Sequence, residues 1–271
     1  MVLGRAVSTP ARLFTADCIF PGMSEFKDLF SGQAALYSQY RPQYPSQLFE
    51  WVAGLVQRHR LAWDCATGSG QAATGLAAHF DNVVATDASE KQITSAALHP
   101  GVEYRIATAY ESGLDDHSVD VVTVAQAIHW FDHDAFYAEV KRVLNSAGAI
   151  AIWGYGDPVL DSVRLDRIVH DYNRGTIEDY WMPERQLILD GYTTIPFPFR
   201  EVEAPVITLQ CRWTLAELAG YMRTWSATAN YAAKHGGDPV APVEAALAEH
   251  WGSPDKRHLI QWPLHIRAGY V

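Results

Sequence analysis

Two carboxylates that each end a short apolar run are the residues of this chain best placed to bind a ligand. Asp64 ends the run LAWD and comes directly before a turn of small residues, CATGSG, and Asp87 ends the run NVVATD. Gly68 and Gly70 permit backbone torsions that are closed to other residues, and they let a ligand lie against the main chain. The spacing therefore predicts a site of nucleotide size at this turn.

Two ligand classes fit the pattern. In one, Gly68-x-Gly70-x-x-Ala73 is a dinucleotide fingerprint, and Asp87, about 20 residues further on, holds a ribose of NAD(P). In the other, Asp64 decides the ligand, because a carboxylate repels phosphate and attracts a cation. S-adenosylmethionine (SAM) carries a sulfonium and an ammonium but no phosphate. An NAD(P)-dependent oxidoreductase would also need a constellation such as Tyr-x-x-x-Lys, and none lies in a suitable place.

Composition argues against several other classes. The chain has 271 residues, 48% of them hydrophobic, which is enough for one large core or a core with a small subdomain. The net charge of −10 and the lack of a Lys/Arg cluster argue against nucleic acid as a partner. No apolar run nears the roughly 20 residues that span a bilayer, so no membrane partner is expected. The three cysteines lie far apart without metal-ligand spacing, so no metal is expected, and the lack of a signal peptide predicts the cytoplasm.

The N-terminal part divides into two segments. Residues 1–22 lack periodicity and end in Pro-Gly before Met23, so they are either an extension upstream of a native start at Met23 or an ordinary N-terminal helix. Residues 26–45, FKDLFSGQAALYSQYRPQYP, carry tyrosines around Arg41, and the prolines beside it break a helix. This segment is either packed on the core or a lid that closes over the site and excludes water.

Strands alternate with helices in the middle of the chain. A helix is expected over 46–59, where apolar residues form one stripe. The alternation predicts right-handed crossovers and a parallel sheet that binds its ligands at the carboxyl ends of the strands. The strands expected in this part are 61–64, 82–87, 102–107, 119–126 and 148–155.

The alternation stops over about 157–204, a segment dense in aromatic residues. We expect this segment to be a cap over an acceptor pocket, a satellite hydrophobic cluster, or both. A strand at 206–213 and a helix at 214–231 follow, and the last strand is expected at 258–271. Pro263 within that strand indicates an edge position or a bulge.

These features together resemble the class I SAM-dependent methyltransferases. The run D-x-A-T-G-x-G is similar to the family motif D/E-x-G-x-G-x-G, with Ala66 in place of the first glycine. The phrases YRPQYP, AQAIHWFD and TWSATANY are similar to those of the trans-aconitate methyltransferase-like, or type 11, subgroup. The resemblance covers the chain from Met23 on. It implies an α/β, Rossmann-like fold with a seven-stranded sheet, parallel except for the last strand, helices on both faces and a small cap after strand five.

The resemblance also implies how SAM is bound. Asp64 and the backbone of the turn would hold the methionyl amino end, and Asp87 would accept hydrogen bonds from both ribose hydroxyls. Thr108 stands where the family usually has an acid or amide against adenine, and Gln126 would lie near the sulfonium. The cofactor-binding residues assigned in this way are Tyr40, Arg41, Asp64, Ala66, Gly68, Gly70, Asp87, Ala88, Thr108, Ala109 and Gln126.

The acceptor chemistry depends on whether a base is needed. Methyl transfer from a sulfonium is an in-line displacement, so the protein mainly aligns and desolvates the acceptor. A carboxylate needs only cationic or hydrogen-bonding groups to orient it. A phenol, an amine or a carbon acid is helped by a base, for which His129 is the candidate unless it simply packs the turn. The residues expected to bind the acceptor are Trp130, Trp181, Tyr192, Arg200, Arg223 and Trp225.

The sequence therefore predicts a methyltransferase that acts on a small molecule and releases S-adenosylhomocysteine (SAH). O-methylation of a carboxylate is the leading acceptor chemistry, and the protein is expected to be a monomer or a homodimer. The remaining alternatives are the NAD(P)-dependent oxidoreductase and a catalytically silent SAM-binding protein.

Overall fold

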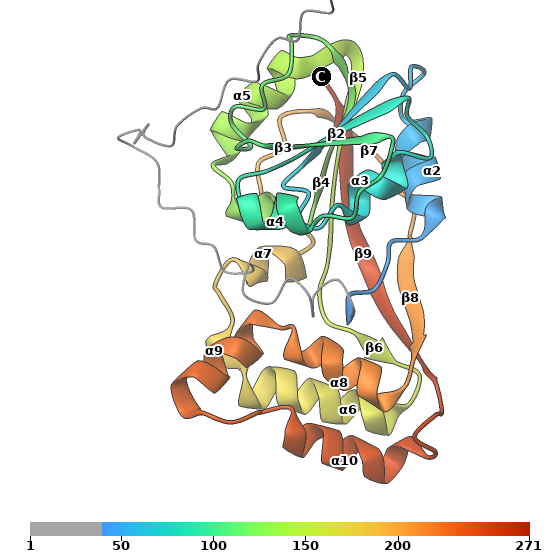
Figure 1. Cartoon of the computed structure of the whole chain (residues 1–271), viewed down its shortest axis with the longest axis vertical. Coiled ribbons are helices and arrows are strands. Elements are labelled where there is room, and N and C mark those ends of the chain that lie inside the picture. Colours follow the sequence, from blue (N-terminus) through green and yellow to red (C-terminus); the bar gives the residue numbers. More distant parts are fainter. Residues whose placement is uncertain (1–39) are drawn as a thin grey trace, which may run out of the picture.

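A largely parallel sheet positions the predicted site. A computed structural model describes residues 40–271, so the expected N-terminal extension, 1–22, and most of the expected lid, 26–39, lie outside the described residues. The strand order is β3-β2-β1-β4-β5-β9-β6, and β7 and β8 also pair with β9 (Figure 1). The strands are β1 (Leu61–Cys65), β2 (Asn82–Asp87), β3 (Val102–Ile106), β4 (Val119–Ala125), β5 (Leu144–Tyr155), β6 (Val159–Leu160), β7 (Arg200–Val202), β8 (Thr208–Trp213) and β9 (His258–Tyr270).

Helices cover both faces of this sheet, as the sequence predicts. Successive residues of a strand point to opposite faces, and the core is accordingly divided. Ala62 packs with α2 and α3, whereas its neighbour Trp63 packs with α5. The helices of this part are α2 (Ser46–Gly54), α3 (Gln71–Leu76), α4 (Glu90–Ser95), the short η2 (Ile128–Trp130) and α5 (His133–Val143).

The sheet has nine strands rather than the predicted seven, because the two strands beside β9 are each interrupted. Residues 156–158 separate β5 from β6, and residues 203–207 separate β7 from β8, although each pair lies along one side of β9. The strands β1 to β5 are parallel and β9 is antiparallel to β5, as predicted.

Pro263 lies in the interior strand β9, not at an edge. The N–H of the next residue, Leu264, donates to Ile207 on the β8 side. Because backbone nitrogens alternate in direction along a strand, the nitrogen of Pro263 faces the gap at 156–158. Proline is tolerated there because no partner strand needs its missing N–H.

A layer of helices is attached where β9 and β8 extend beyond the parallel strands (Figure 1). It draws on 163–180 and also on 215–251, so it is larger than the cap expected over 157–204. None of the described helices is both long and apolar enough to cross a lipid bilayer. The helices after β6 are α6 (Val163–Asp171), η3 (Tyr172–Thr176), η4 (Glu178–Tyr180), α7 (Arg185–Leu189), α8 (Leu215–Arg223), α9 (Ser226–His235) and α10 (Ala241–Trp251).

The helix expected over 214–231 is broken into α8 and α9. Thr214 and Glu217 begin α8 with a reciprocal capping box, as the sequence indicates. The helix ends because Trp225 is extended, with φ −72° and ψ 135°, while the Thr224 hydroxyl donates to the carbonyl of Tyr221 at 2.6 Å. Helix propensity alone gives no sign of this break.

Candidate active site

The turn after β1 lies beside the end of β2, so Asp64 and Asp87 come together at the carboxyl edge of the sheet. Gly68 and Gly70 both have positive φ, 57° and 85°. A side chain at Gly70 would lie 2.3 Å from the hydroxyl of Tyr104, so packing as well as the positive φ favours glycine there. A side chain at Gly68 would meet no heavy atom within 4 Å, so the space above the turn is open to a ligand.

Asp87 is fixed at the rim of this turn. Its carboxylate accepts hydrogen bonds from the backbone N–H groups of Gly68 and Ser89, both at 2.9 Å. A carboxylate accepts several hydrogen bonds at once, and its place at the rim of the turn suits it to accept from the hydroxyls of a ribose. The exposed Ala88 follows it, and Thr108, beyond the end of the adjacent strand β3, accepts from the Tyr110 N–H at 3.3 Å.

Asp64 lies beneath the turn and is fully buried. It accepts hydrogen bonds from the hydroxyls of Thr67, at 2.5 Å, and Thr123, at 2.8 Å. Burial raises the pKa of the Asp64 carboxyl to about 6. Asp64 therefore fixes the turn and places negative charge under it, whereas the sequence places it directly against the methionyl end.

Two residues that are not glycine take left-handed backbone conformations where adjacent strands end. Ala66 follows β1 with φ 54°, and Gln126 follows β4 with φ 58°. Ala66 replaces the first glycine of the resembled motif, and it adopts a torsion that favours glycine. Gln126 donates its side-chain N–H to the carbonyl of Tyr155 at 3.0 Å. The two turns lie side by side, because β1 and β4 are adjacent strands.

The acceptor atoms and the negative charge at the turn suit a ligand that has a ribose and a positive charge. Asp87 offers acceptors, the Gly68 position is open, and the buried carboxylate of Asp64 disfavours phosphate. These residues fit SAM, and they would hold its ribose and the backbone-facing methionyl part.

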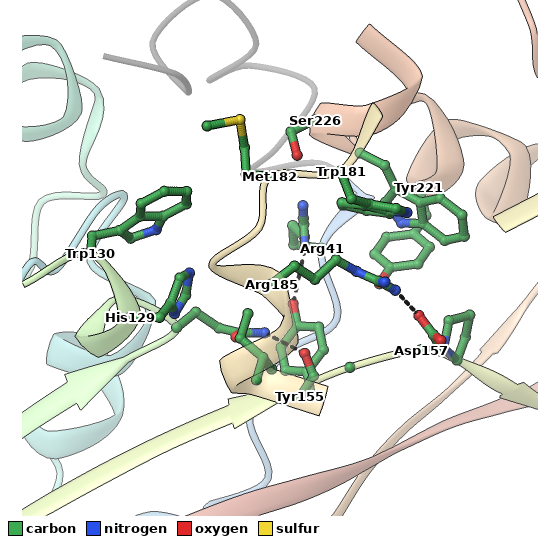
Figure 2. Close-up of a pocket in the computed structure, with 15 residues that line it drawn as sticks. Arg41, His129, Trp130, Tyr155, Asp157, Trp181, Met182, Arg185, Tyr221 and Ser226 are labelled. Carbon is green, nitrogen blue, oxygen red and sulfur yellow. Dashed lines mark hydrogen bonds and ion pairs between the residues drawn. The ribbon is translucent and has the colours of Figure 1, made fainter. Parts of the chain in front are cut away.

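A cavity lies next to this turn, between the carboxyl edge of the sheet and the helical layer (Figure 2). Arg41 reaches it from the segment before α2, and Gln71 of α3 holds that segment by donating to the Pro42 carbonyl at 2.8 Å. The cavity is lined by Arg41, Gln126, His129, Trp130, Tyr155, Gly156, Asp157, Pro158, Trp181, Met182, Arg185, Ile188, Tyr221, Trp225 and Ser226.

A network of polar side chains fixes Arg185 in the cavity wall. Its guanidinium carbon lies 4.1 Å from the centroid of the Trp181 ring, and the group is ion-paired with Asp157. Asp157 also binds Arg174 at 2.8 Å and accepts from Asn173 at 2.7 Å. Asn173 in turn accepts from the indole N–H of Trp181 at 2.9 Å. Arg185 is therefore held by both the stacked ring and the shared carboxylate.

His129 lines the same cavity but does not have the properties of a strong base. It is 7% exposed, and burial lowers its pKa to about 4, so the imidazole is neutral at pH 7. Its Nδ1 lies 3.4 Å from the hydroxyl of Tyr192, which is fully buried behind it. The general-base role considered for His129 requires a pKa near neutrality, and this geometry argues against it.

The structure brings together only part of the predicted acceptor set. Trp130, Trp181 and Trp225 line the cavity, and Tyr192 supports it through His129. Tyr40, expected at the cofactor, instead packs on Gly220 of α8.

Arg200 and Arg223 do not belong to the cavity, contrary to the prediction. Arg200 pairs with Tyr270 at the end of β9. Tyr270 faces Ala149 in the first half of β5, so Arg200 lies toward the amino ends of the parallel strands and away from the carboxyl edge. Arg223 is bound by Asp238 at 2.9 Å and by Glu244 at 2.6 Å within the helical layer.

The sequence analysis missed Asp157 and Arg185, and it placed Arg41 at the cofactor only. Asp157 directly follows β5, and the rule that open α/β sheets bind ligands beyond their carboxyl ends would have selected it. Arg185 begins α7, and Trp181 lies in the extended segment before that helix, so no helical spacing relates the two residues. No local signal distinguishes Arg185 from the arginines that face elsewhere.

Comparison with known proteins gives a consistent result. A family model described as a methyltransferase domain matches residues 63–152. A Dictyostelium discoideum protein named as a methyltransferase is 32% identical over 238 residues, covering 87% of this chain and 90% of the relative. A solved structure described as a type II methyltransferase from Anaeromyxobacter dehalogenans is 42% identical with a TM-score of 0.81, covering 85% of this chain and 98% of the other. A Saccharomyces cerevisiae protein named as SAM-dependent is 28% identical over 135 residues, covering 46% of each chain.

Proposed function

The chain belongs to the class I SAM-dependent methyltransferases, and from that premise we propose that it methylates the carboxylate of a small organic acid bound in the cavity. Family membership decides between SAM and NAD(P) as the ligand of the turn after β1. The observation that carries the choice of acceptor is the presence of two guanidinium groups, Arg41 and Arg185, in the cavity wall. Arginine is the side chain best suited to bind a carboxylate in a fixed orientation.

The surroundings of these arginines favour a carboxylate over an acceptor that must lose a proton. The titratable side chain on the opposite side of the cavity is His129, whose lowered pKa of about 4 makes it a weak base. A carboxylate is already ionised at pH 7 and needs orientation only.

The residues divide the work of the reaction. SAM supplies a methyl group that its sulfonium activates. Asp87 and the backbone at Gly68 hold the donor, and Arg185, stacked on Trp181, orients the acceptor carboxylate. The aromatic wall excludes water, which matters because an anion and a cation become two neutral groups during transfer, and such a loss of charge is favoured in dry surroundings.

The experiment that tests this proposal uses SAM labelled in its methyl group and a panel of small carboxylic acids, phenols and amines. Methyl esters release labelled methanol in mild alkali, whereas ethers and methylamines are stable. We expect alkali-labile product from the acids. Label found only in alkali-stable product would overturn the proposal and leave the methyltransferase assignment intact.

A further inference from the structure

We propose that the acceptor is an aromatic or conjugated monocarboxylate, which rests on the function proposed above and narrows it. Carbon surface dominates the cavity wall away from the arginines, and most of it belongs to flat rings. The apolar and aromatic side chains that line the cavity are Trp130, Tyr155, Trp181, Met182, Ile188, Tyr221 and Trp225.

These rings are held in place by one another. Trp225 lies 5.9 Å from Trp181 and 5.5 Å from Tyr221 between ring centroids, and Tyr221 lies 5.3 Å from Trp262 in β9. Tyr221 and Trp225 are 2% and 4% exposed. Because they cannot turn away without disturbing the core, they present fixed flat surfaces. Such surfaces pack best against a flat, polarisable ligand, and these side chains lose little conformational freedom when the ligand binds.

The charged groups of the cavity are gathered on one side. Figure 2 shows Trp130 and His129 across from Arg41 and Arg185. An acceptor whose carboxylate meets the arginines therefore places the rest of its body between rings. A second carboxylate at the far end would be desolvated against Trp130 without a cationic partner. Asp157 offsets one of the two positive charges in the cavity wall, so Arg41, Arg185 and Asp157 together leave one net positive charge, which matches one carboxylate and not two.

Three acids separate these contributions. Benzoate is flat and carries one charge, cyclohexanecarboxylate has the same charge without a flat ring, and terephthalate adds a second carboxylate to the same ring. We would measure kcat/KM for methyl ester formation, and affinity for the SAH-saturated protein by calorimetry. Benzoate should exceed cyclohexanecarboxylate about fivefold, the size of one stacking contact. It should exceed terephthalate at least about tenfold, since the second charge is buried unpaired.

A pair of tryptophan variants tests whether the cavity causes the preference. Trp130→Leu should reduce the ratio of benzoate to cyclohexanecarboxylate to about one while SAH affinity is unchanged. Trp51→Leu, in α2 and outside the cavity, should keep the ratio. The ratio shows the effect even if either variant lowers the yield of folded protein.

The possible failures are distinguishable. Turnover of terephthalate or of an aliphatic tricarboxylate equal to that of benzoate would overturn the aromatic monocarboxylate and leave carboxylate methylation standing. An unchanged ratio in Trp130→Leu would also overturn it. If no acid binds or is methylated while phenols or amines give alkali-stable product, the proposed function itself fails.

Discussion

The cofactor turn and the acceptor cavity share one edge of the sheet but are assembled differently. The turn is a single run, 61–70, completed by Asp87 from the neighbouring strand. The cavity collects side chains from five segments spread between Arg41 and Ser226. A structure built from one short run depends on local backbone rules, whereas the cavity depends on how distant elements pack. The acceptor side can therefore change without disturbing the cofactor side.

The two regions also differ in charge, and the sign of each is opposite to that of the substrate expected there. Carboxylates lie at and under the turn, where a cationic donor is expected, and two arginines line the cavity, where an anionic acceptor is proposed. If the two regions are independent, substitutions in the cofactor turn should change SAH affinity or stability and leave kcat/KM for the acceptor otherwise unaffected. Substitutions in the cavity should lower kcat/KM for the acceptor and leave SAH affinity unchanged.

The largest expected effect comes from Asp64 and concerns stability against pH. Its folded pKa of about 6 lies above the ordinary value of 3.8, because the buried carboxylate is poorly solvated. Between these two pH values Asp64 is ionised in the unfolded chain but still protonated in the folded protein. The free energy of unfolding therefore falls by about 3 kcal/mol as pH rises from about 4 to 6, and it stays level above that. Denaturant unfolding of the wild type and of Asp64→Asn across this pH range measures the change in the free energy of unfolding.

In that comparison the wild type should lose stability relative to Asp64→Asn as pH rises, since the neutral amide cannot ionise. The difference between the two proteins removes the contributions of all other titrating groups. A difference that stays flat from pH 4 to 7 would show that folding does not raise the pKa of Asp64.

Asp87→Asn should weaken SAH binding about 50-fold, because hydrogen bonds to a charged acceptor contribute about 1.5–3 kcal/mol. Calorimetric titration measures the change. Asp120→Asn is the matched control: Asp120 is a buried carboxylate at the other end of the sheet, accepting from the backbone N–H groups of Arg60 and Leu61 at 2.7 and 3.1 Å. Asp120→Asn should lower the free energy of unfolding but leave the affinity for SAH unchanged. Equal loss of affinity in both variants would mean that Asp87 acts only through the fold.

Sequence reasoning succeeded where the information is local. The expected strand 82–87 coincides with β2, and Gly68, Gly70 and Asp87 come together at the carboxyl edge as predicted, with Asp64 buried beneath them, because period, turn chemistry and strand order determine this arrangement. The alternation of strands and helices gave the parallel sheet. The reversal at β9 was predicted only through the family resemblance.

It failed where packing over long distances decides the outcome. Arg200 and Arg223 were chosen over Arg185, although nothing in the residues around them shows which face they meet in the folded chain. The break that turns Trp225 into the cavity interrupts a good helical sequence. The extension of β9 past Pro263, which carries the helical layer, depends on a gap in the strand beside it.

Arg185→Met should lower kcat/KM for the acceptor about 20-fold and leave SAH affinity unchanged, because it removes the charged hydrogen bonds that orient the acceptor. Initial rates with labelled SAM measure the first quantity and calorimetry the second. Arg174→Met is the matched control, since Arg174 shares Asp157 but does not line the cavity. If both variants lose the same activity, Arg185 acts by holding Asp157 in place and not by contacting the acceptor.

The smallest expected effect returns to the cofactor turn. Ala66 has φ 54°, a conformation that costs an alanine about 1–2 kcal/mol and a glycine little, although glycine is also more flexible in the unfolded chain. Ala66→Gly should therefore stabilise the protein by about 0.5–1 kcal/mol, raising Tm by about 1–2 °C in thermal unfolding. Ala72→Gly, in the helix α3 that the turn opens, should destabilise it by a similar amount or more. The same substitution six residues apart then has opposite signs, and destabilisation by both would show that the left-handed torsion at Ala66 is not strained.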